Sequence, residues 1–146
     1  MNTQSKATAP LPKQLQAMER IYHAWDQALA SNDIDALLAL YAPDATIESP
    51  LIPYLLGTET GVCHGHAAMR PLFEKLAQRK PKIRQYYRTG YFTDGEKLMW
   101  EYPRVAGDAE QMDFVEVMEV RNELIQKHRV YWGWFGFKVL QEDRYR

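Results

Sequence analysis

The sequence is poor in cysteine, and this scarcity limits how the fold can be stabilised. Cys63 is the only cysteine among the 146 residues, so no disulfide bond can form within the chain. A small secreted scaffold held together by disulfides is therefore excluded. We expect a reducing compartment, and the simplest localisation is cytoplasmic.

Long apolar runs and an excess of charge of one sign are also missing. The first residues, MNTQSKATAPLPK, lack the apolar stretch of a signal peptide, and no segment approaches the roughly 20 apolar residues that cross a bilayer. The 18 basic and 19 acidic residues give a net charge of −1. A nucleic-acid binder usually carries a basic stripe, which is absent from this sequence. We therefore expect neither a membrane nor a nucleic acid as a partner.

The residues that are present suit one globular domain. Apolar residues make up 46% of the chain and charged residues 25%, and 146 residues are enough to bury a core. We expect a flexible lead-in over residues 1–12, a single domain over residues 13–140 and a charged tail over residues 141–146.

Three helices are predicted from periodicity and capping signals. Apolar residues spaced by three and four predict a helix over 13–30. A second helix follows in SNDIDALLALYAPD, where Ser31 or Asn32 can cap the start and Pro43 ends it. The third lies in GHAAMRPLFEKLAQRK, and Pro71 is tolerable because it falls near the start.

The second half of the chain has the alternation of β-strands. ATIES is predicted as one short strand, and KIRQYYRTGYF, EKLMWEYPRV, MDFVEVMEV and LIQKHRVYWGWFGF as four antiparallel strands. LIPYLLGTETG is too broken for a regular element, and its apolar residues are expected to cover a pocket mouth or a subunit partner. The predicted fold class is α+β, with helices packed on one face of a curved sheet.

SNDIDALLALYAPDATIESP, followed by the GHAAMRPLFEKL helix and a four-strand meander, resembles the SnoaL-like branch of the NTF2-like superfamily. Ketosteroid isomerases, scytalone dehydratases and limonene epoxide hydrolases belong to the same superfamily. The resemblance covers roughly residues 13–138, and YAPDATIESP is its sharpest part. It implies a cone with a pocket at its open end and homodimers through the outer sheet face. It does not imply one reaction, because this fold hosts many.

The chain departs from the isomerases at the positions that the resemblance makes comparable. Ser49 stands where their general base, an aspartate, is found, and Trp25 stands where their oxyanion-binding tyrosine is found. Glu116 falls near their inward acidic residue, and His128 falls where an apolar pocket residue lies. Ketosteroid isomerisation by the family's own residues is therefore not expected.

The register of the last two strands decides which way Glu116 points. A three-residue loop at 121–123 would pair Glu116 with His128 and would separate the apolar face from the charged face. A two-residue turn would instead set Glu116 opposite Arg129 and mix charge into both faces, which a half-buried sheet avoids. We predict the three-residue loop, with Glu116 and His128 facing each other inside the protein.

An inward glutamate beside a histidine has two interpretations that the sequence leaves open. Buried charges are normally partnered, so the pair could serve only to hold the sheet together. Burial disfavours a charged carboxylate whereas a charged imidazole favours it, and such opposed effects are typical of catalytic pairs. On the second interpretation Glu116 and His128 carry proton transfers.

Other residues are assigned smaller roles. The side chains expected to shape the pocket are Tyr22, Trp25, Phe114, Met118 and Trp132. Trp134 is expected in the pocket or core, and Tyr131 and Phe135 on the outer face. CHGH (63–66) has too few convergent ligands for zinc, so we expect no metal site and no cofactor.

Two functions of different class remain. The first is an acid–base enzyme of isomerase, cyclase or dehydratase type that acts on a small hydrophobic molecule through Glu116 and His128. The second is a non-catalytic ligand-binding or dimerisation module. An opening that reaches Glu116 would favour the enzyme, and a pocket filled by the 51–56 segment would favour the module.

Overall fold

The computed structural model describes residues 12–79, 87–104 and 112–143. In this part of the chain the helices are α1 (Lys13–Ala30), α2 (Ile34–Leu38), α3 (Leu51–Leu56), α4 (His66–Arg79) and α5 (Trp134–Gln141). The strands are β1 (Tyr41–Glu48), β2 (Val62–His64), β3 (Phe92–Thr93), β4 (Lys97–Tyr102), β5 (Phe114–Arg121) and β6 (Leu124–Trp132). None of the described helices has the length and apolarity that a bilayer span requires.

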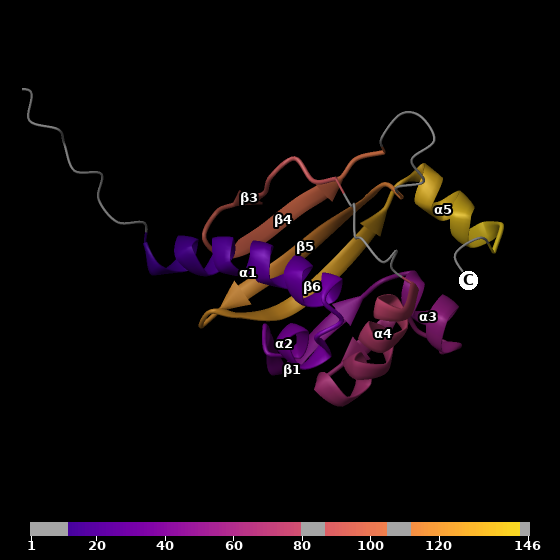
Figure 1. Ribbon diagram of the computed structural model, residues 1–146, viewed down its shortest axis with the longest axis horizontal. Coiled ribbons are helices and arrows are strands. Elements are labelled where there is room, and N and C mark those ends of the chain that lie inside the picture. The colour runs from indigo at the N-terminus through magenta and orange to yellow at the C-terminus, as the bar shows by residue number, and fades with distance from the viewer. Residues whose placement is uncertain (1–11, 80–86, 105–111, 144–146) are drawn as a thin grey trace, which may run out of the picture.

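The strands form one curved sheet in the order β2-β1-β6-β5-β4-β3. β1 runs parallel to β6, and the other neighbours are antiparallel. Figure 1 shows α1 crossing one side of the sheet, with α2 and α4 beside the β1 end and α5 beyond the end of β6. The predicted α+β class is confirmed.

The core lies between the helices and the inner face of the sheet. The predicted period of α1 is confirmed, because Met18, Ile21 and Trp25 fall on one buried stripe. β4 alternates strictly, so Leu98, Trp100 and Tyr102 face inward while the residues between them face solvent. This alternation defines the inner and outer faces of the whole sheet.

Pro43 does not end the second helix as predicted. α2 ends at Leu38, and β1 begins at Tyr41 and runs through Pro43. Proline has no N–H to donate to a ladder, and the register of β1 on β6 shifts between Tyr41 and Thr46, where Pro43 lies. The start of α2 is capped by the side chain of Asp33, which accepts from the Ala36 N–H, rather than by Ser31 or Asn32.

The LIPYLL segment is a short helix and not the irregular loop that was predicted. Pro50 precedes α3 and Pro53 is its third residue, where a helix has no use for the N–H that proline lacks. Gly57 ends α3 in the left-handed conformation at φ 68°. Leu51, Ile52 and Leu55 are buried, so this helix closes one side of the core.

The final strand is shorter than predicted. β6 ends at Trp132 and the chain turns into α5 at Trp134. The backbone N–H of Gly136 donates to Asp113 Oδ1 at 2.7 Å and that of Gly133 to the Asp113 carbonyl at 2.7 Å. The prediction for Trp134 is wrong, because its side chain is 70% exposed.

The predicted loop between β5 and β6 is also wrong, although the predicted face is right. Asn122 and Glu123 form a two-residue turn with φ 52° and 63°. One extra residue of β6, Gln126, then shifts the pairing between Val120–Ile125 and Glu119–Lys127. This bulge restores the parity that the turn would have changed, so Glu116 pairs with Val130 and still shares the inner face with His128.

Some predictions fall outside the described residues. They are the lead-in except for Pro12, most of the strand predicted from residue 82, the turn at 106–109 and the end of the tail at 144–146.

Candidate functional site

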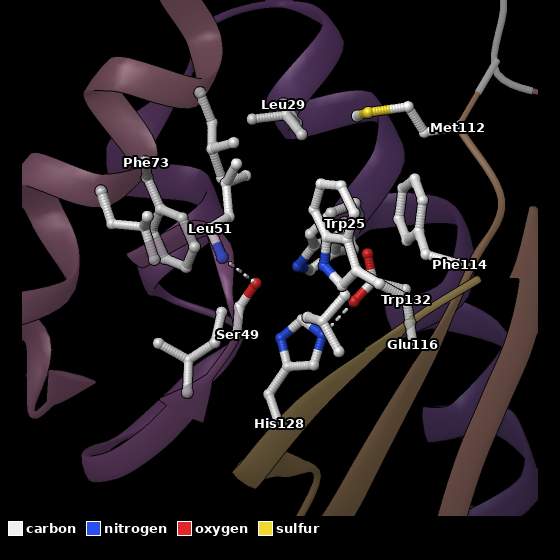
Figure 2. A pocket seen from close by; sticks show the side chains of 14 residues that line it. Trp25, Leu29, Ser49, Leu51, Phe73, Met112, Phe114, Glu116, His128 and Trp132 are labelled. Atoms are coloured by element: carbon white, nitrogen blue, oxygen red, sulfur yellow. Dashed lines mark hydrogen bonds and ion pairs between the residues drawn. The ribbon is translucent and has the colours of Figure 1, made fainter. Parts of the chain in front are cut away.

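Three buried polar residues converge on one cavity. Ser49, Glu116 and His128 are 5%, 3% and 1% exposed, and they are the buried polar or charged side chains of the described chain. All three line a cavity of about 60 Å³ between the sheet and the helices (Figure 2). The remaining lining is apolar: Trp25, Leu29, Ile47, Leu51, Leu72, Phe73, Leu76, Met112, Phe114, Val130 and Trp132. Polar groups gathered in an apolar cavity are typical of a ligand site.

Glu116 and His128 are in direct contact. His128 lies directly across from Met118 and diagonally from Glu116 on the inner face. The Nε2 atom of His128 makes a short hydrogen bond with Oε2 of Glu116. Direct cross-strand pairing is not needed for this contact, because diagonal neighbours on one face are within reach of long side chains.

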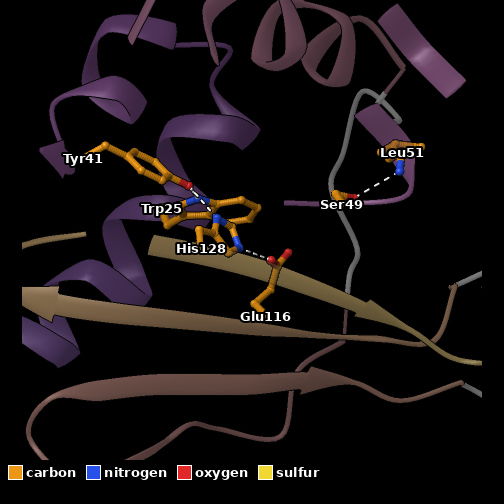
Figure 3. A network of polar contacts seen from close by, with 6 residues as sticks. All are labelled: Trp25, Tyr41, Ser49, Leu51, Glu116 and His128. Atoms are coloured by element: carbon orange, nitrogen blue, oxygen red, sulfur yellow. Dashed lines mark hydrogen bonds and ion pairs between the residues drawn. The ribbon is translucent and has the colours of Figure 1, made fainter. Parts of the chain in front are cut away.

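The imidazole is bound on its other side by Tyr41. Trp25 Nε1 lies 2.9 Å from Tyr41 Oη, and Tyr41 Oη lies 2.8 Å from His128 Nδ1 (Figure 3). An indole N–H can only donate, so Tyr41 accepts from Trp25 and has its own proton left for Nδ1. With Nδ1 accepting from Tyr41, Nε2 is the ring nitrogen that donates to Glu116. The network thus orients a carboxylate through a defined tautomer.

Tyr41 holds its proton firmly. Burial raises the pKa of this phenol well above 10.0; the Trp25 hydrogen bond lowers it, and the nearby Glu116 and Tyr102 raise it. Tyr41 therefore stays a hydrogen-bond donor to His128 throughout the neutral range. Sequence reasoning did not single out this residue.

This raised pKa predicts an alkaline loss of stability that depends on Tyr41. Above pH 10 the unfolded chain releases the proton that folded Tyr41 keeps, so the free energy of unfolding falls by about 1.4 kcal/mol per pH unit from this group. The contribution is present below pH 10 and lost as the pH rises. Urea unfolding from pH 9 to 11 should show a shallower decline for Tyr41→Phe than for the wild type. Equal slopes would contradict the assignment.

Of the five residues predicted to shape the pocket, three line the cavity and two do not. Trp25, Phe114 and Trp132 line the cavity. Tyr22 and Met118 are buried but are not among its lining residues. Arg88 lies over the Tyr22 ring, with its guanidinium carbon 3.9 Å from the centroid. Tyr22 and Met118 therefore belong to the core and not to the cavity lining.

Ser49 is the residue that sequence reasoning undervalued. It was considered only as a replacement for a general base. Ala45, Ile47 and Ser49 have the same parity along β1 and just beyond it, and all three are buried. Extending the alternation of ATIES would have placed Ser49 inside, whereas Tyr41 lies on the other side of the irregularity at Pro43.

The cavity borders a larger outer groove. This groove has a volume of about 790 Å³ and shares Ser49, Val130 and Trp132 with the cavity. An apolar cavity of about 150 Å³ holds the six heavy atoms of benzene, so a cavity of about 60 Å³ suits only about two or three heavy atoms. A larger ligand would have to extend past the shared residues.

The CHGH segment does not gather ligands. Cys63 faces the core from β2, and its neighbour His64 faces outward. His66 Nε2 lies 2.9 Å from the Tyr41 carbonyl oxygen. In the described ranges no group of three His, Cys, Asp or Glu side chains is arranged to hold a metal ion.

Solved structures with this architecture span several descriptions. A SnoaL-like protein of unknown function from Burkholderia thailandensis is 17% identical with a TM-score of 0.66, and the match covers 85% of this chain and 99% of that one. A putative ketosteroid isomerase from Kribbella flavida is 19% identical (TM-score 0.59, 81% and 78% covered). SalBIII, an epoxide hydrolase/cyclase-like enzyme of salinomycin pyran-ring formation, is 21% identical (TM-score 0.60, 82% and 93% covered).

Identities this low concern the fold alone. No curated protein sequence matches the chain. Residues 19–128 match the SnoaL-like domain family, a range that begins in α1 and ends at His128 in β6. This range contains α2, α3 and α4, the first five strands and all three buried polar residues of the cavity. The chain therefore belongs to the SnoaL-like family.

Proposed function

We propose that the cavity is the active site of an acid–base enzyme in which Glu116 accepts a proton from a small, largely apolar substrate. The carrying observation is that this buried carboxylate lies on the cavity lining and that His128 binds only one of its oxygens. Among the described residues the second oxygen, Oε1, has no hydrogen bond. In Figure 2 it points away from His128.

The surroundings suit a carboxylate base. The Nε2 atom of His128 contacts the carboxylate and holds it in one orientation, while Tyr41 and Trp25 hold the ring. Orientation of a base by a fixed network removes much of the entropic cost of proton transfer. The apolar lining keeps competing water from the carboxylate. Isomerase, cyclase and dehydratase reactions all begin or end with such a transfer, and similar folds carry an isomerase-like and a cyclase-like description.

The first experiment is proton exchange, which needs no knowledge of the natural substrate. Butanone is dissolved in D₂O with the protein, and loss of its α-proton signals is followed by ¹H NMR. Butanone has five heavy atoms, which is more than the cavity volume alone suits, so part of it would extend toward the outer groove. We expect exchange above the buffer background that saturates with butanone. Exchange no faster than buffer at all concentrations would contradict a base that is open to carbonyl ligands.

One observation favours the second function, a non-catalytic module. The enclosed volume of about 60 Å³ is small, and Leu51 from α3 forms part of its wall. A module would bind butanone without exchange, or would exclude it. The same NMR titration therefore separates the two functions.

We also propose that a second copy covers the outer face of the sheet. Four large apolar side chains are exposed there, at 40% to 71% of their surface: Val62, Phe92, Met99 and Tyr131. Aromatic residues and Met are enriched in protein interfaces, and the ion pair Arg129–Glu119 lies on the same face. Homodimers through this face are also what the family resemblance implies.

Met99→Glu is expected to dissociate this dimer. A carboxylate buried in the interface without a partner should raise the dimer dissociation constant at least roughly 100-fold. Sedimentation velocity gives the measurement, with Glu74→Gln on the exposed face of α4 as the control. Wild-type protein that sediments as a monomer at high concentration would contradict the dimer.

A further inference from the structure

Exposed aromatic rings line the outer groove. Tyr131, Trp134 and Phe137 are 56%, 70% and 51% exposed, and all three belong to the lining of this groove of about 790 Å³. The rings of Trp134 and Phe137 stack with centroids 6.0 Å apart and an interplanar angle of 28°. Large apolar side chains gathered on a concave surface are typical of a binding site.

The rings of the groove are held in place by the fold. Trp132 fits against Gly136, where a β-carbon would lie 2.6 Å from the indole. The start of α5 is fixed by its hydrogen bonds to Asp113. Pro50 and Pro53, at the start of α3, add two further rings to the lining. Rigid rings lose little conformational entropy when they bind a partner.

The charged groups of the groove favour a basic partner. Arg129 is neutralised by Glu119. Glu48 is exposed on the groove lining, and in the described ranges no ion pair of its carboxylate is found. A surface of flat rings with a carboxylate at hand suits proline rings and a positive charge. Aromatic-lined grooves bind proline-rich segments in the polyproline II conformation.

The lead-in of this chain has that chemistry. Residues 6–12 read KATAPLP, and Lys6 is the only charged side chain among residues 1–12. Pro10 and Pro12 fix their own φ angles, and each restricts the residue before it to extended backbone. Pro12, the last residue of the lead-in, has φ −50° and ψ 147°, close to polyproline II.

The lead-in falls short of the groove of its own chain. Four residues span at most about 14 Å, so Ala9 stays within that distance of Lys13. The groove adjoins the cavity, whose lining includes Leu29 near the other end of α1. Lys13 and Leu29 are separated by about 24 Å of helix. Figure 1 shows the start of α1 and α5 at opposite ends of the molecule.

We infer that residues 9–12 of a second copy bind in the outer groove, with their prolines against Trp134 and Phe137 and Lys6 toward Glu48. Tyr131 belongs both to this groove and to the exposed set on the outer sheet face. A second copy on that face would therefore lie beside the groove. In a two-fold dimer each copy would fill the groove of the other. The inference does not depend on Glu116 acting as a base.

Photo-cross-linking of the full chain tests the occupant. p-Benzoylphenylalanine replaces Thr8, next to the proline segment, and ¹⁵N-labelled and unlabelled copies are mixed before irradiation. Mass spectrometry then shows whether a cross-link joins two copies. We expect mixed-isotope cross-links to the tryptic peptide Val130–Lys138, and at least roughly tenfold fewer with Trp134→Ala. Cross-links confined to one chain, or to other parts of the second copy, would overturn the inference.

A fluorescein-labelled peptide of residues 2–13 tests the recognition of proline by fluorescence anisotropy. Trp134→Ala and Phe137→Ala should each weaken its binding roughly 30-fold, as expected for aromatic anchors. Phe92→Ala is the matched control, because Phe92 is 71% exposed but does not line the groove. A peptide with alanine at both proline positions should bind about tenfold more weakly. Equal binding of the two peptides, or full binding by Trp134→Ala, would contradict the groove as a proline site.

A lipid surface is the other occupant that an exposed Trp134 and Phe137 could bind. Cosedimentation with vesicles of phosphatidylcholine and phosphatidylglycerol gives the measurement. We expect no binding above the background of a protein-free control. Vesicle binding that needs Trp134, without cross-links between copies, would assign these rings to lipid and overturn the inference.

Discussion

Glu116→Gln is expected to reduce butanone exchange on the order of 1000-fold while the protein stays folded. General-base catalysis contributes about 100- to 10,000-fold, and an amide cannot take the proton. The glutamine carbonyl can still accept the Nε2 proton of His128, so the contact that links β5 to β6 is kept. Exchange rates by NMR and urea unfolding on the same sample measure the two effects.

Glu119→Gln is the matched control. Glu119 lies on the same strand but on the outer face, where it is paired with Arg129. Its loss should cost less than about 1 kcal/mol, because the pair is partly exposed, and should leave exchange unchanged. If Glu116→Gln exchanges butanone at the wild-type rate, Glu116 is not the base. If it unfolds instead, the carboxylate is structural.

The inward position of Glu116 could be predicted, but its pairing partner could not. Alternation along MDFVEVMEV separates one mainly apolar face, and the burial of that face is a local property of the strand. The register depends on the turn and on the bulge at Gln126, and the two compensate each other. The alternation along one strand shows which side chains share a face, but it does not show the turn length or the bulge that together produce that arrangement.

The carboxyl end of the fold shows a different limit. WGWFGF has β-like composition, yet α5 forms because Asp113 supplies acceptors to the N–H groups of Gly133 and Gly136. Asp113 precedes β5 and Gly133 follows β6, so the whole β5–β6 hairpin separates them in the sequence. No local sequence pattern could therefore reveal the cap. The fit of Trp132 against Gly136 has the same origin.

Ser49 and the cavity volume mark how far the site could be predicted. The alternation of β1 carries the signal for Ser49, but the contact of its hydroxyl oxygen with the Leu51 N–H is visible only in the structure. The small enclosed volume depends on how α3 and the apolar rings pack, which requires side-chain positions throughout the core.

His128→Ala is expected to cost about 3–5 kcal/mol of the free energy of unfolding. Removing one partner of a buried pair leaves the other without compensation. Here the loss reaches Glu116 on one side and the Tyr41 hydroxyl on the other. Urea unfolding at pH 7 gives the measurement. His23→Ala is the control, because the His23 side chain is 64% exposed and its loss should change stability by no more than about 0.5 kcal/mol.

A double-mutant cycle with Glu116→Gln distinguishes the loss of the pair from the loss of volume. An uncharged amide is less costly to leave buried without a partner than a carboxylate. The double variant should therefore be more stable than the sum of the two single effects predicts. Additive losses would mean that His128 contributes packing alone. In that case the imidazole would not orient Glu116, and the base would lose the feature that distinguishes it from any buried carboxylate.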